Sequence, residues 1–159
     1  MIKLTNHLVS YLNNSCKTAI LQLNYKKMIQ KSENTLKVAH QAFEYLMHGL
    51  GTGEWNNFLD MLTEDFSFWF PQGKYQGLNI GKQRAKEFFE YISQELNGVI
   101  KLTSTERITS NETTVVFEFR DEGEFMGIPY KNRIAISLDV REDKICGYRE
   151  YFGSDGKSN

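Results

Sequence analysis

The chain has 159 residues, of which 40% are hydrophobic and 13% are aromatic, enough for one domain with a sizeable core or a lined cavity. A net charge of −1 excludes the basic surface with which proteins bind nucleic acid. No apolar run approaches the about 18 residues of a membrane-spanning helix, so we expect no transmembrane contact and a cytoplasmic protein.

Residues 1–31 differ in charge from the rest of the chain. They contain five lysines and no acidic residue, whereas the remainder has 14 basic and 20 acidic residues. Their apolar residues follow only a loose helical spacing. The sequence therefore predicts an N-terminal extension over residues 1–31, poorly ordered or helical, and a domain over residues 32–155.

Three helices are predicted from apolar residues that recur at three and four positions. They cover residues 35–50, 54–62 and 82–96, and between the last two lie a strand at 66–70 and a loop at 77–81. The stripe that should face the core in the first helix consists of Leu36, Ala39, Phe43, Met47 and Leu50.

Four strands are predicted in the second half of the chain, at residues 99–109, 113–121, 130–141 and 144–152. The short segments between them favour an antiparallel meander. Since helices must cover one face of such a sheet, the order predicts an α+β domain of two layers.

Three stretches resemble the NTF2-like superfamily, and within it SnoaL-like and ketosteroid isomerase-related proteins. They are residues 62–73, residues 75–82 with Gly77 and Gly81-Lys82, and the closing strand at residues 144–152. The resemblance implies a cystatin-like cone, in which three helices pack on a curved, mainly antiparallel sheet around a pocket. It also implies a small apolar ligand and a homodimer formed through the outer sheet face.

Strand alternation selects the side chains that should line this pocket, because every second residue faces the helices. The more apolar set of each strand is assigned to the inner face. The predicted pocket residues are Phe66, Phe68, Phe70, Phe117, Phe119, Ile134, Ile136, Leu138, Tyr148 and Phe152.

Two carboxylates, Asp121 and Glu150, fall on the same inner face. Apolar surroundings raise the pKa of a carboxyl group, which suits general acid/base chemistry. If the protein is an enzyme, these two residues are the candidate catalytic groups. A solvated strand end for Asp121, and a rim position or an ion pair for Glu150, are the structural alternatives.

The resemblance does not decide whether the protein is an enzyme. The acids of ketosteroid isomerases are absent, since Phe70 and Ile136 stand at their positions. The segment from Tyr148 to Phe152 is similar to the end of limonene-epoxide hydrolases, with Glu150 in place of a catalytic aspartate. The arginine between their two acids has no counterpart, because Arg120 should point to the opposite face.

Three functions therefore remain open. The first is binding of a small apolar molecule in the aromatic pocket. The second is an epoxide hydrolase-, cyclase- or isomerase-like enzyme that uses Asp121 and Glu150 as acid and base. The third is an interaction module that dimerises through Trp69, Arg133 and Tyr151 on the outer sheet face.

The sequence predicts no cofactor and no metal site. His40, Glu44 and His48 are spaced four apart on the first predicted helix, which spreads the two imidazoles roughly 12 Å along the axis, too far for one ion.

Overall fold

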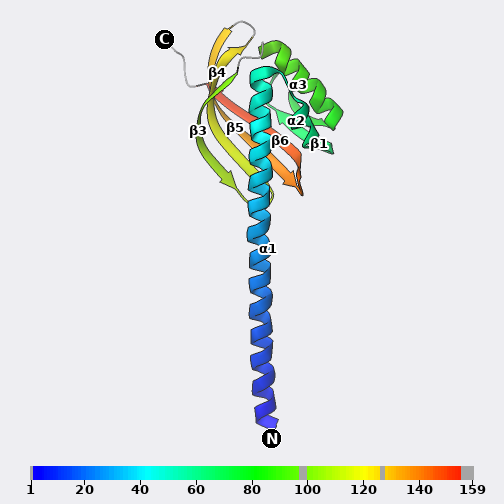
Figure 1. Ribbon diagram of the computed structural model, residues 1–159, viewed down its shortest axis with the longest axis vertical. Coiled ribbons are helices and arrows are strands. Elements are labelled where there is room, and N and C mark those ends of the chain that lie inside the picture. The colour runs from blue at the N-terminus through cyan, green and yellow to red at the C-terminus, as the bar shows by residue number, and fades with distance from the viewer. Residues whose placement is uncertain (1, 97–99, 126–127, 155–159) are drawn as a thin grey trace.

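The computed structural model describes residues 2–96, 100–125 and 128–154. Three helices lie on the concave face of one curved, six-stranded sheet, which confirms the α+β cone (Figure 1). The predicted strand start at residue 99 and the predicted domain end at residue 155 lie outside the described residues. Within the described part, no helix has a stretch long and apolar enough to cross a membrane.

The first helix is far longer than predicted. α1 runs from Ile2 to Thr52 without a break, so the N-terminal extension and the first domain helix are one element. Its C-terminal part crosses the sheet, and its N-terminal part projects beyond the domain (Figure 1). The described side chains before residue 32 are all exposed.

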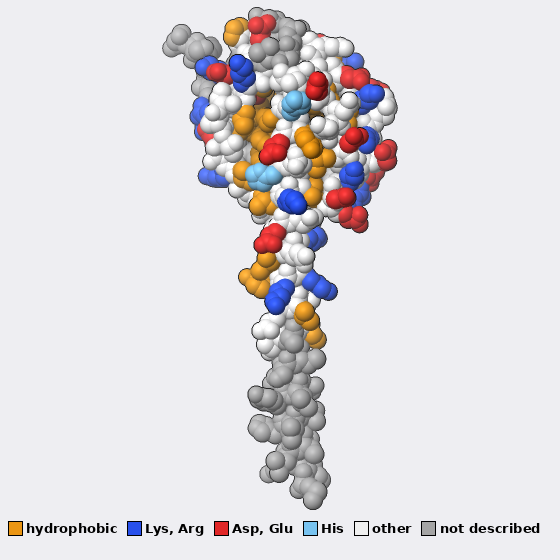
Figure 2. Space-filling view, in the orientation of Figure 1, with side chains coloured by type: hydrophobic (Ala, Val, Ile, Leu, Met, Phe, Trp, Pro, Cys, Tyr) orange, Lys and Arg blue, Asp and Glu red, His pale blue; other side chains and the backbone are white. Residues whose placement is uncertain are grey.

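The core-facing stripe of α1 is centred differently from the prediction. Ala42 and Leu46 are fully buried, whereas Leu36 and Met47 are only partly buried. The buried residues Ala39, Ala42, Phe43 and Leu46 recur at three and four positions, so the buried stripe is rotated about the helix axis relative to the predicted one. Figure 2 shows hydrophobic side chains on both sides of α1 where it crosses the domain.

The other two helices close the cone. α2 (Asn56–Asp60) is shorter than the predicted 54–62, because Leu62 already begins the first strand. α3 (Lys82–Leu96) has the predicted bounds. The indole Nε1 of Trp55 donates to Ser93 Oγ at 2.5 Å, which ties the start of α2 to α3.

The sheet has the strand order β2-β1-β6-β5-β4-β3. Its strands are β1 (Leu62–Phe70), β2 (Gly77–Ile80), β3 (Lys101–Ser110), β4 (Thr114–Phe125), β5 (Ile128–Arg141) and β6 (Lys144–Ser154). β3 to β6 form the predicted antiparallel meander, and β1 joins β6 in parallel. A short 3-10 turn, Gly73–Tyr75, precedes β2.

The predicted loop at residues 77–81 is a strand. β2 pairs with β1 in antiparallel register, with Trp69 opposite Leu78. Its alternation is inverted, since Leu78 and Ile80 are exposed while Asn79 is buried. Leu78, Asn79 and Ile80 alternate, but a run of three residues between two glycines is too short for a strand to be predicted from it.

The turns between the meander strands follow local chemistry. Asn111 Oδ1 accepts hydrogen bonds from the backbone N–H groups of Thr113 and Thr114, which closes the β3–β4 turn. Glu142 has a φ of 60° in the turn between β5 and β6. Both turns fall where the sequence predicts them, and they hold the register that places alternate residues of β4, β5 and β6 on the concave face.

Candidate functional site

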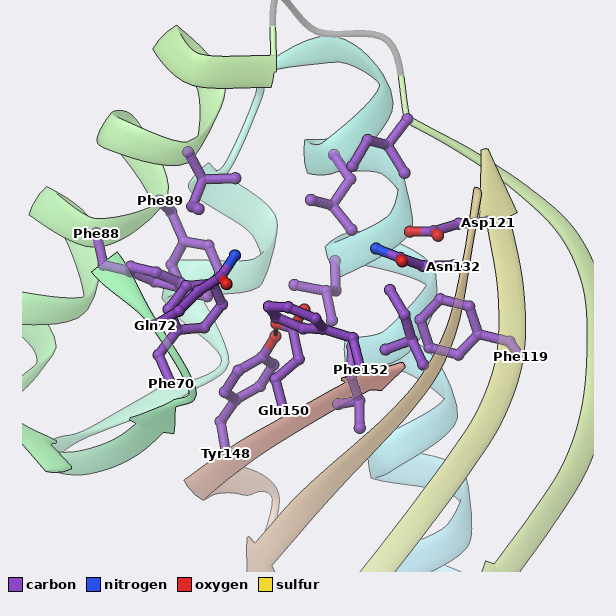
Figure 3. Close-up of a pocket in the computed structure, with 16 residues that line it drawn as sticks. Phe70, Gln72, Phe88, Phe89, Phe119, Asp121, Asn132, Tyr148, Glu150 and Phe152 are labelled. Carbon is purple, nitrogen blue, oxygen red and sulfur yellow. Dashed lines mark hydrogen bonds between the residues drawn. The ribbon is translucent and has the colours of Figure 1, made fainter. Parts of the chain in front are cut away.

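A cavity of about 360 Å³ lies between the helices and the concave face of the sheet. It is walled by α1, α3 and strands β1, β4, β5 and β6, and rings from several of these elements point into it (Figure 3). The lining residues are Leu46, Leu50, Phe70, Gln72, Phe88, Phe89, Ile92, Ile100, Phe119, Asp121, Asn132, Ile134, Ile136, Tyr148, Glu150 and Phe152.

Strand register explains how residues distant in the sequence meet in this wall. Ile136 lies opposite Glu150, and Ile134 lies opposite both Phe119 and Phe152. Because side chains in paired positions point to the same face, each such row contributes two or three residues to the cavity.

Six of the ten predicted pocket residues line the cavity: Phe70, Phe119, Ile134, Ile136, Tyr148 and Phe152. The other four, Phe66, Phe68, Phe117 and Leu138, do not line it and are fully buried in the core. The physical reason is that side chains from the helices pack directly on these inner-face residues and leave no space beside them. Phe43 stacks on Phe117 with ring centroids 4.2 Å apart, and Phe88 stacks on Phe68 at 4.7 Å.

The sequence-based selection missed the helical and polar parts of the wall. Phe88, Phe89 and Ile92 of α3 belong to a predicted apolar stripe, but nothing in a helical stripe separates cavity lining from core. Strand alternation could have predicted Asn132 as a lining residue, because it lies two residues before Ile134 and therefore on the same face of β5. Gln72 follows the end of β1, where alternation no longer applies.

Glu150 lies in the cavity wall beside Tyr148, whose hydroxyl group donates a hydrogen bond to the Glu150 carboxylate (Figure 3). Burial raises the pKa of Glu150 to about 7. The hydrogen bond from Tyr148 acts in the opposite direction, and the negative charge of Asp121 raises the pKa further. Burial and the neighbouring Glu150 together raise the pKa of the Tyr148 hydroxyl well above its usual value.

Asp121 lies within β4 rather than at a strand end, because β4 continues to Phe125. Only 2% of its surface is exposed, which rules out a solvated strand end. It pairs across the sheet with Asn132, and both residues line the cavity (Figure 3).

The two acids belong to different parts of the wall. One intervening strand and four residues of register separate Glu150 from Asp121, although the curved sheet still lets the charge of Asp121 act on Glu150. Arg120 lies on the outer face, where its Nε donates to Glu106 Oε1 at 2.5 Å. The structure therefore does not place Arg120 between the two carboxylates.

Replacing Glu150 by glutamine is expected to flatten the pH dependence of stability. Because the pKa of about 7 in the folded protein exceeds the usual 4.5, the folded state binds more protons than the unfolded state between these values. The free energy of unfolding of the unaltered protein should therefore fall as pH rises from about 4.5 to about 7, by about 2–3 kcal/mol. Glu150→Gln should lose this fall and be the more stable protein at about pH 8.

Urea denaturation at about pH 5 and pH 8 measures both quantities. Glu118→Gln is the matched control, because Glu118 lies on β4 in register with Ala135 on the outer face. An equal pH dependence in the unaltered protein and in Glu150→Gln would contradict the raised pKa.

The chain is similar to several solved structures. An NTF2-like protein from Anabaena variabilis ATCC 29413 shares 70% sequence identity over 80% of this chain and 96% of that chain, with a TM-score of 0.76. A protein of cystatin-like fold from Xanthomonas campestris shares 15% identity over 76% of this chain and 91% of that chain, with a TM-score of 0.65. A protein from Jannaschia sp. CCS1, named as a SnoaL-like polyketide cyclase, shares 14% identity over 76% and 86%, with a TM-score of 0.62.

The last two likenesses show the fold alone, whereas the first shows the family. No protein-family model and no curated protein matches the sequence. The fold and the site define the class of protein: an α+β cone whose helices and curved sheet enclose an aromatic cavity. The chain belongs to the NTF2-like family, as its closing strand and the segments around β1 and β2 predicted.

Within the part of the chain that the structure describes, no three His, Cys, Asp or Glu side chains are grouped as a metal site. Cys146 is a free thiol, and burial is the main cause that raises its pKa. Among the described residues that line the cavity, the ionisable ones are Glu150, Tyr148 and Asp121.

Proposed function

We propose that this protein binds a small, largely apolar molecule in the cavity between its helices and the concave face of its sheet. The observation that carries the proposal is the composition of the wall. Six aromatic side chains and six aliphatic ones surround a space of about 360 Å³, a size typical of small-molecule sites. An apolar body gains free energy by leaving water for such a wall.

The cavity is also supported by rigid surroundings. The ring of Phe88 packs against three other rings. The centroid distances are 4.8 Å to Phe70, 4.9 Å to Phe89 and 4.7 Å to the core residue Phe68. These contacts hold the lining rings in place, and a preformed wall binds a ligand without the entropy loss of ordering it.

Blocking the cavity tests this proposal. Ile134 points into it, whereas its neighbour Ala135 faces the outer side of the sheet, in register with Tyr151. Ile134→Trp should fill the cavity and abolish binding of the neutral probe naphthylmethanol, which calorimetry or its own fluorescence measures. Native mass spectrometry of the purified full chain should detect any small molecule that the protein retains.

Ala135→Trp is the matched control, and it should bind the probe like the unaltered protein. Circular dichroism and the melting temperature of both variants show that they are folded. Undiminished binding by a folded Ile134→Trp, or no binding by the unaltered protein, would contradict the proposed site.

A second candidate function is general acid/base catalysis on the bound molecule. Glu150 favours it, since a carboxyl group with a pKa of about 7 exchanges a proton readily near neutral pH. The separation of Asp121 from Glu150 favours a single acid/base residue over a pair that shares one water molecule. If the protein is catalytic, Glu150→Gln should abolish turnover and leave probe binding intact.

The third candidate, a dimerising module, rests on the outer face of the sheet. Trp69 and Tyr151 stack there with ring centroids 5.3 Å apart, and half of Tyr151 is exposed. The homodimer and the cytoplasmic location stay predictions. Native mass spectrometry of the full chain reports the oligomeric state in the experiment described above.

A further inference from the structure

The charges of the cavity wall are of one sign. Among the described residues that line it, Glu150 and Asp121 carry carboxyl groups, and none is a lysine, arginine or histidine. The guanidinium groups of the same strands lie on the outer face, where Arg133 binds Glu106 and Arg149 binds Asp139. An anionic ligand would therefore lose its hydration without gaining a cation from these side chains.

The aromatic lining of the cavity also favours a positively charged ligand over an anionic one. The rings of Phe70, Phe89 and Phe152 lie around the part of the wall that holds Glu150 (Figure 3). The face of an aromatic ring carries negative electrostatic potential and attracts an ammonium group, most strongly where water is excluded. Rings and carboxylates together favour a ligand that is apolar in its body and positively charged at one end.

We propose that the cavity takes an apolar amine, whose ammonium group donates a hydrogen bond to the Glu150 carboxylate while its body packs on the aromatic wall. This inference rests on the proposed function and names the chemical class of the ligand. Glu150 is the partner because its carboxylate lies in the wall beside the rings, and Asp121 adds a second negative charge to the wall from β4. Charge-assisted hydrogen bonds are stronger than neutral ones.

Binding of such an amine depends on the ionisation of Glu150. The ionisable groups that face Glu150 are Tyr148 on β6 and Asp121 on β4, whereas α1, α3, β1 and β5 contribute only apolar or amide side chains to the wall. An ammonium group favours the ionised carboxylate, so amine binding should release a proton near neutral pH. Amine affinity should rise about tenfold between pH 6 and pH 8, while the affinity for a neutral ligand should not change.

Three probes that share one apolar body test the proposal on the full chain: naphthylmethylamine, naphthylmethanol and naphthoate. Calorimetric titration at about pH 8 should give the amine the highest affinity and naphthoate the lowest. Glu150→Gln should lower amine affinity about 10- to 100-fold, the effect of one charge-assisted hydrogen bond, and should leave naphthylmethanol affinity unchanged. Glu118→Gln, which removes a carboxylate from the outer face of β4, should behave like the unaltered protein.

The outcomes separate this inference from the proposed function. If naphthylmethanol or naphthoate binds as tightly as the amine, or if Glu150→Gln binds the amine unchanged, the amine proposal is overturned and the cavity remains a binding site. If none of the three probes binds, both proposals are overturned. Unequal effects of Glu150→Gln on the amine and the alcohol cannot arise from misfolding, which would weaken both.

Discussion

Replacing Phe117 by alanine is expected to lower the free energy of unfolding by about 3–5 kcal/mol. Phe117 has no exposed surface, its ring stacks on Phe43 with centroids 4.2 Å apart, and His40 contacts it edge-on at 5.3 Å. The truncation removes a large buried apolar area and leaves a void that α1 cannot collapse into, because α1 is also held against β3, β5 and β6. Urea denaturation followed by circular dichroism measures the loss.

Phe152→Ala is the matched comparison, because this phenylalanine is only partly buried and lines the cavity. Its truncation enlarges an existing space rather than creating a new one, so stability should fall by less. The binding of naphthylmethanol should weaken in Phe152→Ala and persist in Phe117→Ala under conditions where that variant is folded. Equal losses of stability would contradict the division between core and cavity wall.

Gly49→Ala is expected to destabilise the protein by about 1–3 kcal/mol or more, although alanine is the better helix former. A Cβ atom on residue 49 would lie 2.2 Å from Cε3 of the Trp55 ring. The ring cannot move aside freely, since Ser93 accepts a hydrogen bond from it and Phe89 packs on it at 4.7 Å. The substitution must therefore displace α1 from α2.

Gly51→Ala separates this clash from helix propensity. Gly51 also lies in α1, but a Cβ atom there would meet only the Ile100 carbonyl oxygen at 3.7 Å, an ordinary contact. This variant should be as stable as the unaltered protein or gain up to about 1 kcal/mol. Thermal and urea denaturation of the two variants measure the difference, and a Gly49→Ala protein as stable as Gly51→Ala would contradict the close approach of Trp55.

Periodicity and turn chemistry by themselves determined the class of fold and most of its elements. α3 and the meander of β3 to β6 follow from local patterns, because an amphipathic stripe and a short turn are properties of neighbouring residues. The same alternation placed Glu150, Tyr148 and Ile134 on the concave face, where the cavity lies. Together with the motifs around β1 and β6, these patterns were sufficient to identify the NTF2-like family.

Only the tertiary structure decided which inner-face residues border empty space. Phe117 and Phe119 are alike in type and alternation, but Phe43 of α1 stacks flat on the first and meets the second only edge-on, so that the second also borders the cavity. The distance between a helix and a sheet depends on contacts along the whole length of the helix, so it cannot be predicted from a local sequence pattern. The same holds for β2, whose pairing with β1 makes it a strand, and for the raised pKa of Glu150, which arises from burial by elements distant in the sequence.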